Sequence, residues 1–487
     1  MQKDHKIKGL DNKKHILIYS APVLVAKAFA FFLIPISTHY LSPQEFGILE
    51  LMLTTVAIAS TLISFGWDST LTRYLSDKQN KMESNRWIVS VLTIRLSGHF
   101  LLLVFIYFLR MNLVKVIGLP LQYLPLLWLV LATTILADLV QTIQLVFRAN
   151  QQSIAYAITA VSATLANFLC SLFALVVLKS GITGLVSAQI IAGLLTITFA
   201  IFRIRKQLKW SFPKFSYIKE ALKFGTPLVP ATIALSLTHW SDLLMLVHLL
   251  PEELALSEVG IYSVATKFSS ILALVFVGFS TWWAPYAYSN YKRPNAQKKF
   301  GNILEFYFLI LFLTAVPIIL LSKEILELLT SSAYQRASFF VSLMTISSIV
   351  HMFGAYSAIG IGIYKKNHIK MIGGIGLSVL NIALNFFLIT RYGTFGAIFA
   401  TMFSYLGYGL YLQICSQKLF PIPIRWFSIA LMSIFLASII LSLNLALFYR
   451  VILLIGGIFL SLICFPEKYR FLWKEVLKSI RYPNSDL

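Results

Sequence analysis

The chain has 487 residues, of which 58% are hydrophobic and only 12% are charged, with a mean hydropathy of +0.79. Soluble globular proteins carry about 25% charged residues, so this composition excludes an ordinary soluble protein and indicates a polytopic membrane protein. The formal net charge of +22 raises the possibility of nucleic-acid binding, and the distribution of the basic residues decides that question below.

Apolar runs of about 20 residues, the length that crosses a bilayer as a helix, recur along the whole chain. We predict an all-α integral membrane protein with about fourteen transmembrane helices and no room for a folded soluble domain. The expected helices cover residues 15–38, 44–66, 86–109, 120–146, 154–178, 182–202, 225–248, 258–286, 299–321, 336–364, 369–390, 394–415, 426–447 and 450–465.

Lysine and arginine are concentrated in the N-terminal segment, in the loops after even-numbered helices and in the C-terminal tail. The densest basic block runs from Arg203 to Lys223, whereas the loop after the seventh helix carries Glu252, Glu253 and Glu258. By the positive-inside rule, this asymmetry predicts that both termini are cytoplasmic. A basic inner face next to anionic lipid accounts for the net charge, so we expect no nucleic-acid partner.

The first six expected helices resemble the seventh to the twelfth. Six is an even number, so both copies enter the membrane from the same side, as in transporters built from parallel repeats around a central cavity. The repeat predicts an N-lobe at 1–205, a C-lobe at 206–418, and two further helices with a basic tail at 419–487. The matching segments include Phe46-Gly47-Ile48 with Val259-Gly260-Ile261, Asn167-Phe168 with Asn385-Phe386, and Gly181–Gly184 with Gly393–Gly396.

Charged and polar residues interrupt several of the apolar runs. A lysine near the middle of a membrane helix, such as Lys27, costs roughly 2.5 to 3.5 kcal/mol on insertion scales, so it needs a partner, water or a ligand. Pairing of Glu50 with Lys27 and of Asp242 with Lys267 is as acceptable as a role in ligand binding. Several expected helices carry charged or polar residues, and where a helix has two or more, they are three or four residues apart and share one face. These residues are Glu50 in the second helix, Arg95 and His99 in the third, Asp138 in the fourth, His239 and Asp242 in the seventh, and Ser263, Lys267 and Ser270 in the eighth.

Signals for enzyme chemistry are weak. The sequence contains no P-loop and no pair of carboxylates at the start of a long outward loop. Its three cysteines, Cys170, Cys415 and Cys464, lie inside apolar runs without the spacing of metal ligands. We therefore expect no enzymatic activity, no metal and no cofactor.

Several motifs resemble those of the polysaccharide transporters, which include the flippases of O-antigen and other lipid-linked oligosaccharides in the multidrug/oligosaccharidyl-lipid/polysaccharide exporter superfamily. The resemblance extends over almost the whole chain, including the number of helices. The motifs are Tyr40–Ile48 (YLSPQEFGI), Phe65–Tyr74 (FGWDSTLTRY), Val259–Lys267 (VGIYSVATK), Trp283-Ala-Pro285 and Gly393–Ala397 (GTFGA).

The resemblance implies a two-lobed flippase that moves a polyprenyl-diphosphate-linked oligosaccharide from the cytoplasmic to the outer face of a bacterial plasma membrane by alternating access. Lipid II flippases of this superfamily use cations on the first and eighth helices near the substrate diphosphate, and Lys27 and Lys267 resemble these by helix. We expect Arg95 in the same cavity and Arg73 at its cytoplasmic mouth. Further expected cavity residues are Glu50, Asp138 and Asp242, which could couple an ion, and the polar residues His239, Ser263 and Ser270.

Other functions share this architecture. A lipid II flippase is the nearest alternative, and a multidrug exporter of the same superfamily is another, although buried cations do not suit cationic drugs. A membrane scaffold for glycan-assembly enzymes would depend on the basic block Arg203–Lys223 and not on Lys27. Expected partners are the lipid-linked glycan, the bilayer, and a glycan polymerase or glycosyltransferases.

Overall fold

The computed structural model describes residues 2–64, 81–150, 152–205, 212–225 and 229–467. Within those ranges every regular element is a helix, which confirms the all-α fold class. Ten of the described helical segments are long and apolar enough to span a membrane, and shorter apolar helices lie at Trp240–Leu249 and Trp426–Ile440. Every apolar run expected from the sequence contains a helix. The number of fourteen membrane helices stays a prediction.

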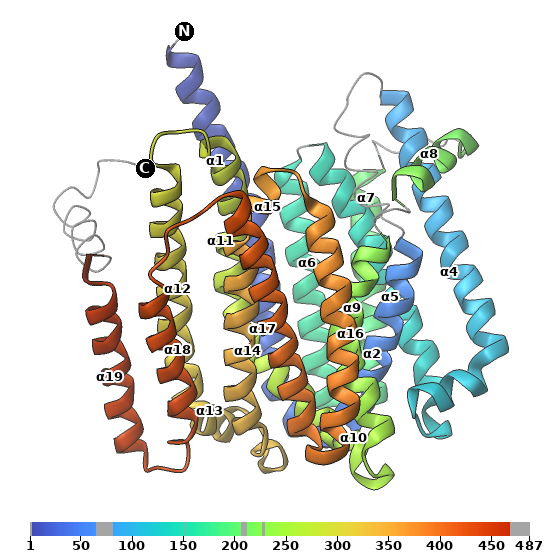
Figure 1. The fold of residues 1–487 in the computed structure, drawn as a ribbon. Helices are drawn as coiled ribbons and strands as arrows, with labels where there is room; N and C mark the ends of the chain where they lie inside the picture. Colours follow the sequence, from blue (N-terminus) through green and yellow to red (C-terminus); the bar gives the residue numbers. More distant parts are fainter. Residues whose placement is uncertain (1, 65–80, 151, 206–211, 226–228, 468–487) are drawn as a thin grey trace. The chain divides into compact units, whose positions relative to one another are not determined.

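Two compact units divide the chain, residues 1–263 and 264–487, and Figure 1 labels their helices. The first unit holds α1 (Gln2–Tyr40), α2 (Pro43–Ser64), α4 (Lys81–Ile117), η1 (Leu121–Tyr123), α5 (Leu124–Ala149), α6 (Ser153–Leu172), η2 (Phe173–Val177), α7 (Gly181–Ile204), α8 (Phe215–Gly225), α9 (Val229–Leu249) and most of α10 (Glu252–Ser269). The second holds α11 (Leu272–Asn290), α12 (Ala296–Leu320), α13 (Ser322–Leu329), η4 (Ser332–Tyr334), α14 (Ala337–Ser357), α15 (Ile359–Ile363), α16 (Asn367–Tyr392), α17 (Thr394–Leu419), α18 (Trp426–Ile440) and α19 (Leu447–Cys464). The lobes that the repeat predicts, at 1–205 and 206–418, stay a prediction.

Helix α2 begins at Pro43, next to the expected start at residue 44. The backbone N–H of Ser42 donates to the Glu45 carboxylate at 2.9 Å, and the backbone N–H of Glu45 donates to the Ser42 hydroxyl at 3.2 Å. This reciprocal capping box satisfies N–H groups that have no partner inside the helix. Pro43 takes the first helical position, where its missing N–H costs nothing.

Helices α2 and α10 cross at two glycines that the sequence repeat pairs with each other. A Cβ atom added to Gly47 would lie 2.0 Å from the carbonyl oxygen of Leu256, and one added to Gly260 would lie 1.9 Å from that of Pro43. Each glycine faces the carbonyl four residues before the other glycine, so the contact is reciprocal. Small residues permit such close approach of two membrane helices, so the two glycines that the sequence comparison pairs lie close together here.

The eighth expected membrane helix, at 258–286, is broken into α10 and α11. The hydroxyls of Ser269 and Ser270 donate to the carbonyls of Thr266 and Lys267, at 2.9 and 2.6 Å. Serine side chains that bond to nearby carbonyls in this way compete with the helical pattern. The break therefore lies at a pair of serines inside the apolar run, which a search for hydrophobic segments does not detect.

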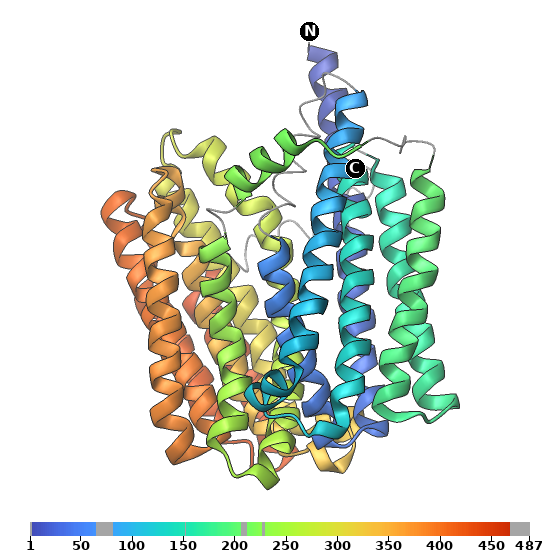
Figure 2. The ribbon, with the colours of Figure 1, turned by 90° about the vertical axis from the view of Figure 1, so that its right-hand side faces the viewer.

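Helix α8 lies within the basic block and runs crosswise to the long helices of the first unit, as the short green helix in Figure 2 shows. The ring of Tyr217 stacks on that of Trp87 in α4, with centroids 4.4 Å apart and planes 9° from parallel. Just before α8, the backbone N–H of Lys214 donates to the Ser90 hydroxyl at 3.0 Å. These contacts fix the beginning of α8 to α4.

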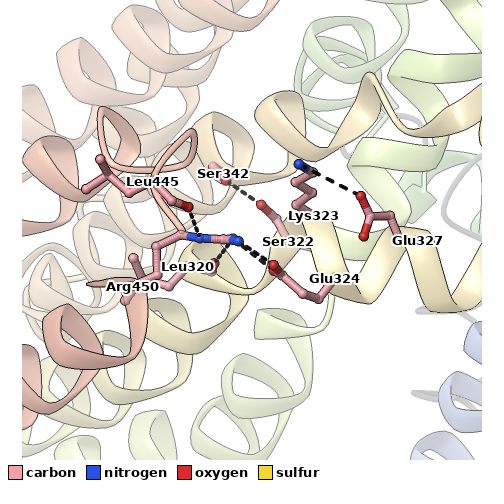
Figure 3. Close-up of polar contacts among 8 residues, drawn as sticks. All are labelled: Leu320, Ser322, Lys323, Glu324, Glu327, Ser342, Leu445 and Arg450. Atoms are coloured by element: carbon pink, nitrogen blue, oxygen red, sulfur yellow. Dashed lines mark hydrogen bonds and ion pairs between the residues drawn. The ribbon is translucent and has the colours of Figure 1, made fainter. Parts of the chain in front are cut away.

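Helices α18 and α19, which follow the repeat, pack against α12, and the three run side by side in Figure 1. At one end of this group the buried Arg450 of α19 pairs with Glu324 of α13 through two of its nitrogens (Figure 3). The same guanidinium donates to the carbonyls of Leu320 and Leu445, at 2.8 and 3.1 Å. Arg450 thus joins α19 to the turn between α12 and α13.

A second arginine holds the beginning of α18 against α12. The backbone N–H of Arg425 donates to the carboxylate of Glu305 at 3.0 Å, and its guanidinium Nε lies 3.9 Å from the same oxygen. The guanidinium also pairs with Glu467, which follows α19. Together with Arg450, this contact ties both ends of the α18–α19 hairpin to the rest of the second unit.

Candidate functional site

Lys27 lies in α1, inside the apolar segment Ala21–Tyr40. Its side chain is exposed and forms no hydrogen bond or ion pair with any residue that the structure describes. The pairing with Glu50 that the sequence left open is therefore not formed; Glu50 itself is half-buried and takes part in another interaction. An ammonium group without a protein partner inside an apolar segment requires water or an anion nearby, or must reach the membrane surface.

The first unit brings together Arg95 and His99 of α4 with Asp138 of α5. The Nη1 atom of Arg95 lies 3.2 Å from one carboxylate oxygen of Asp138, and Nε2 of His99 lies 3.1 Å from the other. The side chains of Arg95 and His99 are buried, at 1% and 3% exposure, while that of Asp138 is 16% exposed. We call these three residues the charged triad.

Helical spacing explains how the charged triad forms. Arg95 and His99 are four residues apart and share one face of α4, and Asp138 and Thr142 share one face of α5 in the same way. The Thr142 hydroxyl donates to the carbonyl of Asp138 at 2.8 Å and accepts a hydrogen bond from Arg95. Sequence reasoning missed Thr142, whose only signal is its spacing of four residues from Asp138.

Asp242, on α9, is nearly inaccessible, at 2% exposure. Its carboxylate accepts a hydrogen bond of 2.6 Å from the hydroxyl of Tyr262 on α10. The next residue, Ser263, is also buried. Tyr262 was not among the expected cavity residues, because a tyrosine in a membrane helix is more often read as an interfacial residue.

In the second unit, Lys267 is half-buried and takes part in at least one interaction, while Ser270 is exposed. Two expected site residues, Arg73 and the side chain of His239, lie outside the described residues. Among the described residues, no group of three or more His, Cys, Asp or Glu side chains could hold a metal ion. The assignment of Lys27, Lys267, Arg95 and the other residues to a substrate site stays a prediction.

The model of one protein family matches residues 13–291, which is more than half of the chain, and its description is "Polysaccharide biosynthesis protein". This chain belongs to that family. Membership confirms the resemblance to polysaccharide transporters that the sequence motifs indicate. A search of curated proteins finds no match.

Solved structures similar to this family member come from the same superfamily. A lipid II flippase, MurJ, in an inward closed conformation has a TM-score of 0.74 at 16% identity, with 94% of this chain and 99% of that chain covered. An inward-facing multidrug resistance MATE transporter gives 0.67 at 12% identity, covering 86% and 98%. A point mutant of the Vibrio cholerae MATE transporter VcmN gives 0.59 at 14% identity, covering 83% and 96%. At these identities the likeness shows the fold, which this chain shares with a flippase and with transporters.

Proposed function

We propose that this protein is a flippase that moves a polyprenyl-diphosphate-linked oligosaccharide, such as an O-antigen, capsule or exopolysaccharide repeat unit, across the plasma membrane. In this proposal the glycan enters from the cytoplasmic face and leaves on the outer face by alternating access. The family description supports a role in polysaccharide biosynthesis. The similarity to a lipid II flippase and to MATE transporters supports a transport mechanism.

The observation that carries the proposal is Lys27. Its ammonium group is exposed, lies within an apolar membrane segment and pairs with no described residue. A diphosphate is the kind of multiply charged anion that would make this position favourable, because charge pairs in a low dielectric are stronger than in water. In the proposal, Lys27 binds the diphosphate.

Lysine differs from arginine in how it binds phosphate. An ammonium group is a compact point charge with three donors, whereas a guanidinium forms two parallel hydrogen bonds in a fixed plane. A lysine site therefore tolerates movement of the diphosphate during transport, at the cost of orientational specificity. In the proposal, the polar headgroup exchanges part of its water for the Lys27 ammonium group, while the lipid tail stays in the bilayer.

A lipid II flippase is the second candidate, since MurJ is among the similar structures. Its substrate is also a lipid-linked glycan, so complementation of a strain without its own lipid II flippase separates the two candidates. A multidrug exporter agrees less well with the site. The unpaired Lys27 would repel cationic compounds.

The test is export of the cell's own surface glycan in a bacterial strain whose only copy of the gene encodes Lys27→Met. We expect lipid-linked oligosaccharide to accumulate on the cytoplasmic face, because the diphosphate loses its counter-charge. Lys27→Arg is the matched control that keeps the charge, and it should retain most of the export. Membrane insertion of each variant is measured in parallel.

Normal export by Lys27→Met at normal protein level would refute a diphosphate role for Lys27. Restoration of lipid II flipping in the complementation strain would select the second candidate.

In the proposal both termini and the basic loops face the cytoplasm, where glycosyltransferases and a polymerase could meet the protein. Labelling of single cysteines placed in the loops before α2 and after α7 checks this orientation.

A further inference from the structure

The charged triad lies in the interior of two predicted membrane segments. Asp138 is 11 residues from the end of the segment Leu121–Ala149 and 17 from its start, which corresponds to roughly 16 and 26 Å along a helix. A titratable group at such a depth is expensive unless it is paired or functional. The pairing with Arg95 meets this requirement for Asp138, whereas His99 is a second, titratable partner that charge balance does not require.

We propose that the charged triad of Arg95, His99 and Asp138 is a proton-binding site that couples transport to the movement of protons across the membrane. The coupling of protons to transport rests on the proposed function, because it requires that the protein moves a substrate. The binding of the proton itself rests on the geometry of the triad alone.

The arrangement of nitrogen donors around Asp138 selects a proton over a metal cation. One carboxylate oxygen faces Arg95 at 3.2 Å and the other faces His99 at 3.1 Å. Sodium requires several oxygen ligands, as hard cations do, and it would be repelled by the permanent charge of the guanidinium. A proton needs one lone pair only, and histidine is the side chain whose charge changes near neutral pH.

His99 provides that lone pair at its second nitrogen. Its Nδ1 atom is buried and has no hydrogen-bond partner among the described residues. With Nε2–H donating to Asp138, the neutral imidazole leaves Nδ1 as an acceptor without a proton. In this state the charges of Arg95 and Asp138 cancel, and the triad is neutral.

Adding a proton changes both the charge and the hydrogen bonding of the triad. The proton comes from water on one side of the membrane, forms an N–H bond at Nδ1 of His99, and later leaves to water on the other side. While bound, it gives the triad a net charge of +1 and a buried donor without an acceptor, both of which are unfavourable in a low dielectric. Proton binding therefore favours a different arrangement around α4, in which water or a polar group reaches Nδ1.

Other titratable groups on the packed helices are engaged elsewhere or lie toward helix ends. Helix α4 packs against α2, α5 and α8, and α5 also packs against α6 and α7. Glu45 caps α2, and Arg148 lies over the ring of Tyr156. Glu50 is half-buried in α2 and takes part in another interaction. The remaining titratable groups with described side chains on these elements and on η1 are Arg86, Tyr107, Arg110, Lys115, Tyr123, Cys170, Arg203, Tyr217, Lys219 and Glu220.

The first measurement is transport in proteoliposomes, with undecaprenyl-diphosphate-linked N-acetylglucosamine carrying a fluorescent label as the probe. We expect an imposed pH gradient to raise the flipping rate of the native protein several-fold. His99→Gln and Asp138→Asn should remove this response. His368→Gln is the matched control, because His368 is exposed at the beginning of α16, and it should respond as the native protein does.

The second measurement needs no substrate. Nuclear magnetic resonance of ¹⁵N-histidine in the full-length protein follows the protonation of His99, assigned by the signal that His99→Gln removes. We expect this signal to titrate between the neutral form protonated at Nε2 and the charged form, with a titration midpoint that shifts in Asp138→Asn. A signal that does not titrate would overturn the proton site.

The two measurements separate the proposals. If the native protein moves the probe but ignores the pH gradient, or if His99→Gln responds like the native protein, the proton coupling is wrong and the flippase function stands. If His99 titrates as described while no probe is moved, the proton site stands and the proposed function fails.

Discussion

Two buried arginine–carboxylate pairs in the two units differ in how completely they are satisfied. Arg450 in the second unit reaches both oxygens of Glu324 and two backbone carbonyls (Figure 3). Arg95 in the first unit contacts one carboxylate oxygen of Asp138, the Asp138 carbonyl and the Thr142 hydroxyl, and it takes part in at least one further interaction. The second carboxylate oxygen of Asp138 faces His99. The carboxylate of the pair in the second unit contacts only its arginine in this group, whereas the carboxylate of Asp138 is shared between an arginine and a histidine.

The two arrangements suit different roles. A closed, bidentate pair holds helices in one geometry, as expected for Arg450, which joins α19 to the turn between α12 and α13. A shared carboxylate can redistribute its hydrogen bonds when a proton arrives, as expected for Asp138. Burial of charge by itself therefore does not indicate function; the presence of a second, titratable partner does.

The largest effect is expected from Arg450→Leu. The change leaves Glu324 without its partner and the carbonyls of Leu320 and Leu445 without their donors. Removing one member of a buried pair costs about 3 kcal/mol or more, and thermal unfolding in detergent should show a corresponding loss of stability. The double variant Arg450→Leu/Glu324→Leu should regain much of it, since no charge is then left uncompensated. Equal melting of the single and the double variant would contradict a paired role.

Much of the fold could be predicted from the sequence, because apolar length and turn chemistry are local. Each apolar run contains a helix, and the capping box at Ser42 and Glu45 marks the start of α2. The repeat also singled out Gly47 and Gly260, which prove to face each other. The break after Ser270 was missed, since a hydrophobicity scan does not register two serines that bond to the backbone.

The candidate site could be predicted only in part. Spacing places Arg95 and His99 on one face of α4. Periodicity within a helix does not tell that this face lies against Asp138 of α5, because it does not show which helices are neighbours or in what register they pack. Arg95 was therefore assigned to the diphosphate and Asp138 to ion coupling, as separate groups. Arg450 was passed over because it lies at the boundary of an expected helix.

Replacing each arginine by lysine sharpens the comparison. Arg450→Lys loses the two parallel bonds to Glu324 and at least one bond to a carbonyl, so we expect a loss of about 1.5 to 3 kcal/mol in unfolding free energy. Arg95 contacts the Asp138 carboxylate, the Asp138 carbonyl and Thr142 through the single nitrogen Nη1, and takes part in at least one further interaction. A lysine could replace the contacts that Nη1 makes. Arg95→Lys should therefore melt closer to the native protein and keep its response to a pH gradient. A larger loss for Arg95→Lys than for Arg450→Lys would reverse the assignment of the closed and the shared pair.

The smallest effect is expected from Thr142→Val, which keeps the shape of the side chain and removes its hydroxyl. That hydroxyl donates to the carbonyl of Asp138 at 2.8 Å and accepts from Arg95, so its loss should cost about 1 kcal/mol of stability. Because the hydroxyl orients Arg95 toward Asp138, the titration midpoint of His99 should also move, whereas Thr142→Ser should preserve it. If Thr142→Val lowers the melting temperature and leaves the His99 titration unchanged, the hydroxyl only supports α5, and Arg95 is held toward Asp138 by the ion pair itself.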